Sequence, residues 1–188
     1  MRVIFGIGNP GHRYSNNRHN AGFLLLDFVA SQKSLSFLSA KGDYHYAKGI
    51  ACDTNFLLIK PTTFVNNCGF ASKQVTDEYD LPIEDFLVVC DDTSLDLGTV
   101  RVRLSGGDGG HNGLASIIYN LNSNGFPRIR IGVGQSLNKN GLVEYVLSDF
   151  TTDEVTKLRN IFEKATSLID EFISGGSKAM LDLNSKMN

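Results

Sequence analysis

The 188-residue sequence has no tryptophan, three cysteines, four prolines and no apolar run approaching the ~20 residues that a membrane-spanning helix needs. Cys52, Cys68 and Cys90 are scattered and form no CxxC pair, so we expect neither a disulfide scaffold nor a structural zinc site. The N-terminus lacks the pattern of a signal peptide, because glycine and proline come too early. We therefore expect a cytoplasmic protein with reduced thiols and no membrane contact.

Positive charge is not in excess. The chain has 18 Lys and Arg against 20 Asp and Glu, which gives a net charge of −2. Because proteins that mainly bind nucleic acid are usually basic, a polyanionic partner would have to be bound by a local basic patch. The hydrophobic fraction of 41% is typical of an ordinary globular protein, and the length accommodates one domain.

Strand-like and helix-like periodicities alternate along the chain. The predicted strands are residues 2–6, 44–51, 56–60, 86–90, 100–104 and 128–133. The predicted helices are residues 20–31, the later part of 64–79, 112–121, and 151 to about 174. This alternation predicts a single α/β domain over residues 1–176, with a mixed sheet flanked by helices on both faces. Residues 177–188 are predicted to be a polar tail with one weak helical patch, AMLDL.

The sequence GIGNPG at residues 6–11 fits the dinucleotide-binding pattern GxGxxG and follows a predicted strand. In that motif a helix begins within the glycines, whereas here apolar periodicity resumes only at Phe23. The acidic residue expected at the end of a second strand is also missing. We therefore favour a tight turn that delivers Asn9 to a cleft beyond the first strand. A nucleotide-binding oxidoreductase is the alternative.

Four polar segments lie where predicted strands end or predicted helices begin: residues 8–22, 60–69, 90–98 and 105–113. Because loops at the carboxyl ends of parallel strands form the binding crevice of an α/β sheet, we expect these segments to meet. Together they supply Asn9, His19, Asn66, Asn67, Asp91, Asp92, His111 and Asn112.

His19 is the best candidate for a general base, because its ordinary pKa suits proton transfer near neutrality. Asp91 follows a buried strand and could orient that imidazole. The alternatives are a surface histidine and a carboxylate that caps a turn. His111 fits a helix N-terminus, as a scaffold residue or a substrate contact. With no GxSxG nucleophile and no metal-ligand spacing at His12 and His19, the simplest hydrolytic chemistry is a water activated by His19, without a covalent intermediate.

The motifs GIGNPG, RHNAGF, KPTTFVNNCG, DD, GGDGGHNGL and RIRIGVG occur in this order. In order and composition the sequence resembles the bacterial peptidyl-tRNA hydrolase family, over about residues 1–150 and more loosely to 174. The resemblance implies a single α/β domain with a twisted, mixed, largely parallel sheet. It also implies hydrolysis of the ester that joins a peptide to the 3′-terminal ribose of tRNA, without a cofactor.

The resemblance further implies roles for individual residues. His19 matches the catalytic histidine and Asp91 its partner, while Asn9 would position the water or stabilise developing charge. The residues implied or expected to contact the substrate are Asn66, Asn112, Phe64, His111 and Tyr14. Arg103 and Arg130 match a basic clamp for the tRNA 5′-phosphate.

The expected partner is therefore peptidyl-tRNA, through its acceptor end and attached peptide, and we expect a monomer. The patterns VRVRL and RIRIG could form a compact arginine patch on two neighbouring strands. Solvated arginines that pair with local acids are the alternative. A catalytically silent RNA-binding relative is a second alternative, against which the retained His19, Asp91 and asparagines argue. Ala115 departs from the family, which commonly has a basic residue after HNGL.

Overall fold

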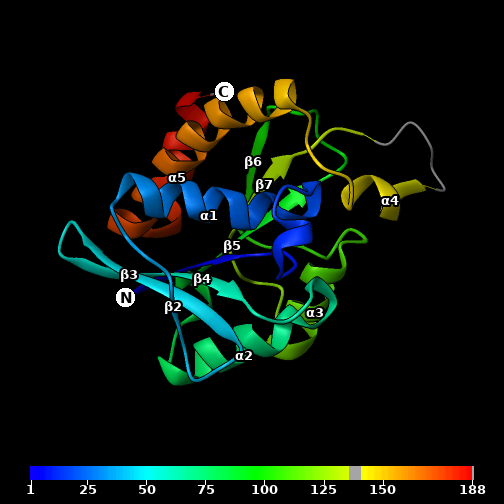
Figure 1. Cartoon of the computed structure of the whole chain (residues 1–188). Coiled ribbons are helices and arrows are strands. Elements are labelled where there is room, and N and C mark those ends of the chain that lie inside the picture. Colours follow the sequence, from blue (N-terminus) through cyan, green and yellow to red (C-terminus); the bar gives the residue numbers. More distant parts are fainter. Residues whose placement is uncertain (136–140, 188) are drawn as a thin grey trace.

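The computed structural model describes residues 1–135 and 141–187, and within them seven strands form one sheet (Figure 1). Their order is β2-β3-β4-β1-β5-β7-β6. The strands β4, β1, β5 and β7 are parallel, whereas β2, β3 and β6 pair antiparallel with their neighbours. The predicted mixed, largely parallel α/β sheet is confirmed. The strand bounds are β1 Arg2–Gly6, β2 Leu38–Ser39, β3 Tyr44–Ala51, β4 Thr54–Pro61, β5 Phe86–Asp92, β6 Val100–Arg103 and β7 Arg128–Gly132.

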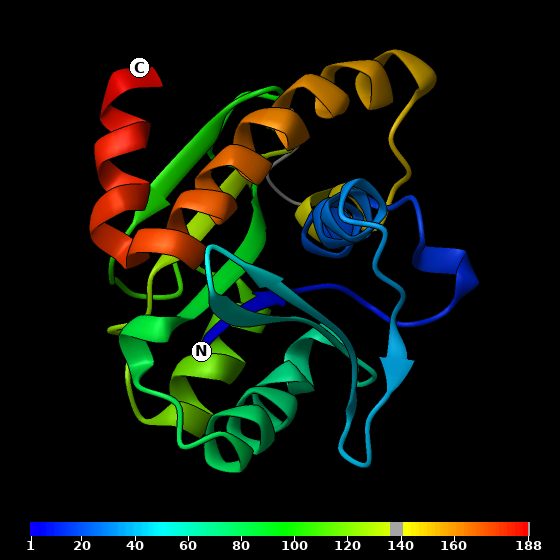
Figure 2. The same ribbon diagram turned by 90° about the vertical axis from the view of Figure 1, so that its left-hand side faces the viewer.

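Helices cover both faces of this sheet, with α1 and α5 on one side and α2 and α3 on the other (Figures 1 and 2). No helix in the described ranges combines the length and the apolar character needed to cross a bilayer. The helix bounds are α1 Ala21–Gln32, α2 Cys68–Glu78, α3 Asn112–Leu121, α4 Leu142–Val146 and α5 Thr152–Met187. Short 3₁₀ turns are η1 His12–Tyr14, η2 Arg18–Asn20, η3 Val65–Asn67 and η4 Ile83–Asp85.

Each face of the sheet has its own hydrophobic core, because successive strand residues point to opposite faces. In β1, Ile4 packs toward α1 and α5, whereas Val3 and Phe5 pack toward α2 and α3. Every residue of β5 is buried, as expected of a central parallel strand covered on both sides. The sheet is therefore a rigid base for residues at its carboxyl edge.

Helix α1 begins directly against the ends of two strands. A Cβ at Gly22 would lie 2.5 Å from the carbonyl oxygen of Ile7 and 2.6 Å from that of Val89. Glycine is therefore required there, and its absence of a side chain lets the first turn of α1 rest on the backbone after β1 and within β5. This close approach fixes the short turn η2, which immediately precedes α1.

The C-terminal segment differs from the prediction of a polar tail. Helix α5 continues to Met187, with one break at Gly176, whose φ of 72° is not helical. The predicted end of the long helix at the glycine pair is thus a kink. Beyond it Met180 is fully buried, and Leu181 and Leu183 pack against the core. These three residues belong to the AMLDL patch, and their contacts hold the second half of α5 on the protein.

Candidate active site

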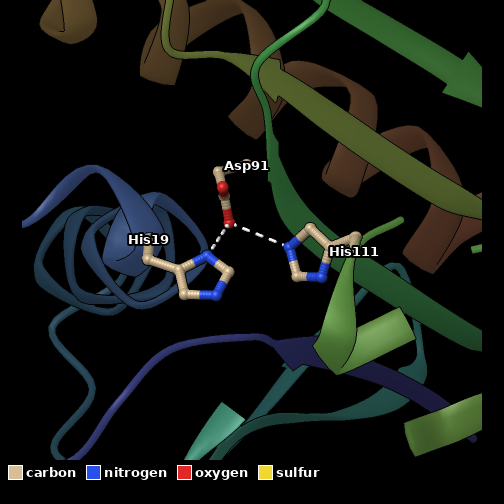
Figure 3. Close-up of side chains that lie close together, drawn as sticks. All are labelled: His19, Asp91 and His111. Carbon is tan, nitrogen blue, oxygen red and sulfur yellow. Dashed lines mark hydrogen bonds and ion pairs between the residues drawn. The ribbon is translucent and has the colours of Figure 1, made fainter. Parts of the chain in front are cut away.

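Two histidines share one buried carboxylate oxygen at the carboxyl end of β5 (Figure 3). Asp91 is 3% exposed. Its Oδ1 atom lies 2.8 Å from Nδ1 of His19 and 2.9 Å from Nε2 of His111. The two imidazole rings are 4.9 Å apart, centroid to centroid. The sequence predicted the approach of His19 to Asp91 but not the second bond from His111.

Hydrogen bonding assigns the protons of both rings. An ionised carboxylate only accepts, so Nδ1 of His19 and Nε2 of His111 must both donate to Asp91. The backbone amides of Gly113 and Leu114 donate to Nδ1 of His111, at 3.1 and 3.3 Å. Nδ1 of His111 therefore accepts these two bonds, and the residue caps α3. In neutral His19 the lone pair is therefore on Nε2, and nothing in the described part of the chain donates to that atom.

The charges of this cluster shift its pKa values in opposite directions. Burial disfavours the Asp91 carboxylate, yet His111 and His19 outweigh it and hold the Asp91 pKa well below its ordinary value. Burial lowers the His19 pKa, but the charge of Asp91 and its hydrogen bond reverse the balance and raise the pKa above 6.5. His19 is thus a stronger base than a free histidine, beside a permanently ionised carboxylate.

Hydrogen bonds also join the Asn9 turn to two other segments. The side chain of Asn20 accepts from the backbone amide of Asn9 at 2.8 Å and donates to its carbonyl at 3.0 Å. Oδ1 of Asn9 accepts from the amide of Val65 at 3.0 Å. Because that amide must meet an oxygen, the NH₂ group of Asn9 is the free end of the side chain, with no acceptor among the described residues. All four polar segments therefore meet, as expected.

A cleft of about 190 Å³ opens beside this cluster, lined by His19, Asp91, His111, Asn112 and Arg130. Asn112, the first residue of α3, is exposed. Leu142, Val143 and Val146 of α4 supply an apolar wall that the sequence did not predict.

Three further candidates lie on the segments around the Asn9 turn. Asn66 is exposed in η3. The ring of Phe64 is about half exposed and meets Tyr14 edge-on at 6.1 Å.

His111 uses both ring nitrogens within the protein, which fits the scaffold alternative, and its contact with substrate stays a prediction.

The arginine patch is smaller than the strand pattern predicted. β6 and β7 pair Arg101 with Arg130 and Arg103 with Arg128, so all four residues share one face. Arg128 is buried, however, and donates to the carbonyls of Gly107 and Asn124. Its inclusion in a phosphate-binding patch was therefore wrong. Arg103 is fully available on the edge strand.

Arg130 is partly exposed and forms an ion pair with Asp92 at 2.7 Å. The alternative of arginines that pair with local acids thus applies to Arg130. Since Arg130 also lines the cleft, its guanidinium retains access to a phosphate there.

His19, Asp91 and His111 could in principle ligate a metal ion, since their nearest ligand atoms lie within 4.8 Å of one another. The tautomer of His111 argues against it. Two backbone amides already donate to Nδ1, so a metal on Nε2 would displace the ring proton and leave an imidazolate. The two histidines are arranged to donate hydrogen bonds to one carboxylate. The expected absence of a metal stays a prediction.

The cysteines near the cluster are poor nucleophiles. Burial raises the pKa of the Cys68 thiol to about 12 and raises that of Cys90 as well. Neither forms a thiolate near neutral pH, which fits the interpretation of both as small apolar core residues.

The glycine motif does not begin a nucleotide-binding helix. After Gly11 the chain passes through η1 and η2, and α1 starts only at Ala21. Gly8 serves a close contact, because a Cβ there would lie 2.6 Å from the ring of Phe23. Only Gly11 of the three motif glycines has positive φ, at 101°. The motif is a turn, as favoured from the sequence, and Asn9 lines a pocket separate from the cleft beside His19.

Sequence reasoning missed Asn20 and Arg18, which are both nearly fully buried. Both lie in RHNAG, one of the two most distinctive motifs of the chain. Their position was the signal that could have indicated them, because these polar residues flank the candidate base His19 directly before an apolar helix.

Comparisons with known proteins identify the family of this chain. A family model described as peptidyl-tRNA hydrolase matches residues 3–188. The chain belongs to the peptidyl-tRNA hydrolase family. It is 39% identical over 188 residues to the peptidyl-tRNA hydrolase of Clostridium botulinum (strain Alaska E43 / Type E3), covering all of this chain and 94% of that protein. It is 36% identical to the enzyme of Bacillus subtilis (strain 168), covering all of this chain and 98% of that protein.

A solved structure of a peptidyl-tRNA hydrolase is also similar. The crystal structure of the enzyme from Acinetobacter baumannii matches with a TM-score of 0.90 at 28% identity, covering 98% of this chain and 94% of that one. The family resemblance and the prediction of an ester hydrolase are thus confirmed. The individual site residues stay predictions.

Proposed function

We propose that this chain hydrolyses the ester between the peptide, or another N-blocked aminoacyl group, and the 3′-terminal ribose of tRNA. The observation that carries the proposal is the orientation of His19. Its Nδ1–H donates to a buried carboxylate at 2.8 Å, and His19 lines an open cleft, so the lone pair of the neutral ring is on Nε2. Membership of the peptidyl-tRNA hydrolase family supplies the substrate class.

The reaction needs one proton transfer in each direction. Nε2 of His19 takes a proton from water as its oxygen attacks the ester carbonyl, and a tetrahedral oxyanion forms. When the intermediate collapses, the bond to the ribose oxygen breaks, and His19 returns the proton to that oxygen. Free tRNA and a peptide carboxylic acid leave the site. Asp91 stabilises the transient imidazolium, and such acid–base catalysis contributes roughly 10²–10⁴-fold.

The asparagines complete the site with neutral hydrogen-bonding groups. The free NH₂ of Asn9 can donate to the developing oxyanion. Asn66 and Asn112 can each donate and accept, as a peptide amide requires. A free aminoacyl-tRNA carries an ammonium group in place of that amide and would leave such groups unpaired. The site therefore favours N-blocked substrates.

The decisive experiment measures ester cleavage of N-blocked and free aminoacyl-tRNA side by side, in buffer with excess EDTA. We expect fast release of tRNA from the N-blocked substrate only, and no effect of the chelator. A chain that binds tRNA but cleaves neither substrate would be the silent RNA-binding relative, and the proposal would fail.

Asn9 provides a test of the oxyanion contact. Asn9→Asp keeps an oxygen for the Val65 amide but removes the NH₂ donor and adds a negative charge. We expect kcat to fall by roughly 10²–10³-fold, because one oxyanion donor is worth about that much. The new charge at this buried position should lower the melting temperature, but the protein should still fold because the turn keeps its bond to the Val65 amide. Unaltered kcat would show that Asn9 has only a structural role.

The proposed phosphate contacts predict a change in salt dependence. Arg103→Ala and Arg130→Ala should each raise KM and leave kcat largely intact. Each should also flatten the slope of log(kcat/KM) against log[salt] by roughly 0.7–0.9, the value for one lost phosphate contact. Arg159→Ala, an exposed arginine on α5, is the control and should leave the slope unchanged. Equal slopes in all three variants would reject the assignment.

A further inference from the structure

Arg18, the residue before His19, is 6% exposed and lies in a dense set of hydrogen bonds. One guanidinium nitrogen donates to the carbonyl of Asp149 at 2.6 Å and to the hydroxyl of Ser148 at 2.8 Å. Another donates to both carboxylate oxygens of Glu154, at 2.7 Å each. The ion pair thus joins a buried guanidinium to a partly buried carboxylate, with 8% and 23% of the side chains exposed, and it is geometrically more restrictive than a fully exposed pair.

The guanidinium is also held by aromatic rings and by the backbone on either side. It lies 4.6 Å from the ring centroid of Tyr145 and 5.2 Å from that of Phe150. The Arg18 amide donates to the Ser148 carbonyl at 3.1 Å, and the Phe150 amide donates to the Asn16 carbonyl at 3.0 Å. The segment before His19 is thus paired with the segment before α5.

Glu154 is itself fixed in the first turn of α5. Its carboxylate accepts from the Thr151 amide at 2.8 Å, and its own amide donates to the Thr151 hydroxyl at 3.3 Å, which is a capping box. Burial opposes its charge, but these bonds and Arg18 keep the Glu154 pKa below its ordinary value. An anchored, ionised acid therefore faces the arginine.

The turn that carries His19 needs such support. η2 is a 3₁₀ turn of only three residues, and only irregular chain and η1 connect it to β1. Gly22 fixes it from the helix side, and Asp91 contacts its imidazole at one point. A displacement of about 1 Å would break that bond, since hydrogen bonds weaken steeply beyond 3.2 Å.

We propose that the Arg18–Glu154 pair is a positioning device that holds η2 so that Nδ1 of His19 stays on Asp91. The proposal rests on His19 being the base of the proposed function. Arg18 touches no reacting atom, and it acts through the turn that it anchors.

Arg18→Lys and Glu154→Gln test the proposal, because Lys keeps the charge without the fork and Gln keeps the shape without the charge. We expect kcat to fall roughly 10- to 100-fold in each, as misplaced catalytic groups do, with KM within about twofold. The His19 pKa, followed by ring NMR against pH, should fall as its contact with Asp91 loosens. The double variant should be no slower than the slower single variant, because both substitutions break one pair.

The ion pair of Lys33 with Asp170 is a matched control, because at 2.7 Å it also links the α1 region to α5. Lys33→Gln should leave kcat and the His19 pKa unchanged even if it lowers the melting temperature. Equal kcat losses in Lys33→Gln and Arg18→Lys would show that the Arg18–Glu154 pair has only a structural role. An unchanged kcat and His19 pKa in folded Arg18→Lys would also overturn the proposal. An active His19→Ala enzyme would instead reject the proposed base itself.

Discussion

Replacement of His19 by alanine is expected to lower kcat for N-blocked aminoacyl-tRNA by roughly 10²–10⁴-fold, the range of general-base catalysis. KM and tRNA affinity should barely change, since the phosphate contacts and the asparagines remain. The reason is specific to one residue: in neutral His19 the Nε2 nitrogen has no partner among the described residues and can take a proton, whereas both nitrogens of His111 are engaged.

His45→Ala is the matched control for this experiment. His45 lies on β3 and pairs with the hydroxyl of Ser39, so its loss should leave kcat unchanged. Wild-type turnover by His19→Ala would remove the assigned base, and an equal loss in both variants would indicate a general effect of histidine removal.

Asp91→Asn is expected to have the second large effect. The amide can donate to Nδ1 of His19, which would then place the ring proton on Nε2, where it blocks the base. We expect kcat to fall by roughly 10²–10⁴-fold, as an inverted tautomer does in other histidine-dependent hydrolases. Because Oδ1 is the atom that meets both histidines, the same substitution also removes the acceptor of the His111 Nε2–H, so we expect the melting temperature to fall as well.

The same variant predicts a pH shift whose sign follows from the causes of the His19 pKa. Neutral His19 is the active form, so kcat/KM rises with pH through that pKa, which lies above 6.5 in the native protein. The substitution removes the carboxylate that raises the pKa and leaves burial, which lowers it. The acid limb of the profile should therefore move to lower pH. A limb that stays in place, or moves to higher pH, would contradict the proposed pairing.

Most helices and strands could be predicted from the sequence, because the hydrophobic periodicity of an element depends on residues that are close together in the chain. The strands at residues 2–6 and 44–51 and the helix at 112–121 have the expected bounds. Two elements lacked a local signal. Helix α4 spans only five residues, and β2 is a pair of residues held by its partner β3.

Long-range contacts explain what the sequence did not reveal in the site. The approach of His19 to Asp91 could be predicted because His19 directly precedes a recognisable helix and Asp91 directly follows a recognisable strand. Arg128 looked equivalent to Arg130 in RIRIG, yet carbonyls of the preceding loops bury it. Arg18 depends on Glu154, which is 136 residues away, and no periodicity marks such a pair.

One oxygen atom of Asp91 accepts hydrogen bonds from two layers of the protein. His19 comes from the turn before α1, on one face of the sheet, and His111 caps α3 on the other. Sliding of either layer by less than an ångström would lengthen one of these bonds past its useful range. In the proposed mechanism, turnover should therefore depend on how well the two hydrophobic cores stay in register. Repacking far from the cleft can silence the enzyme while its chain remains folded.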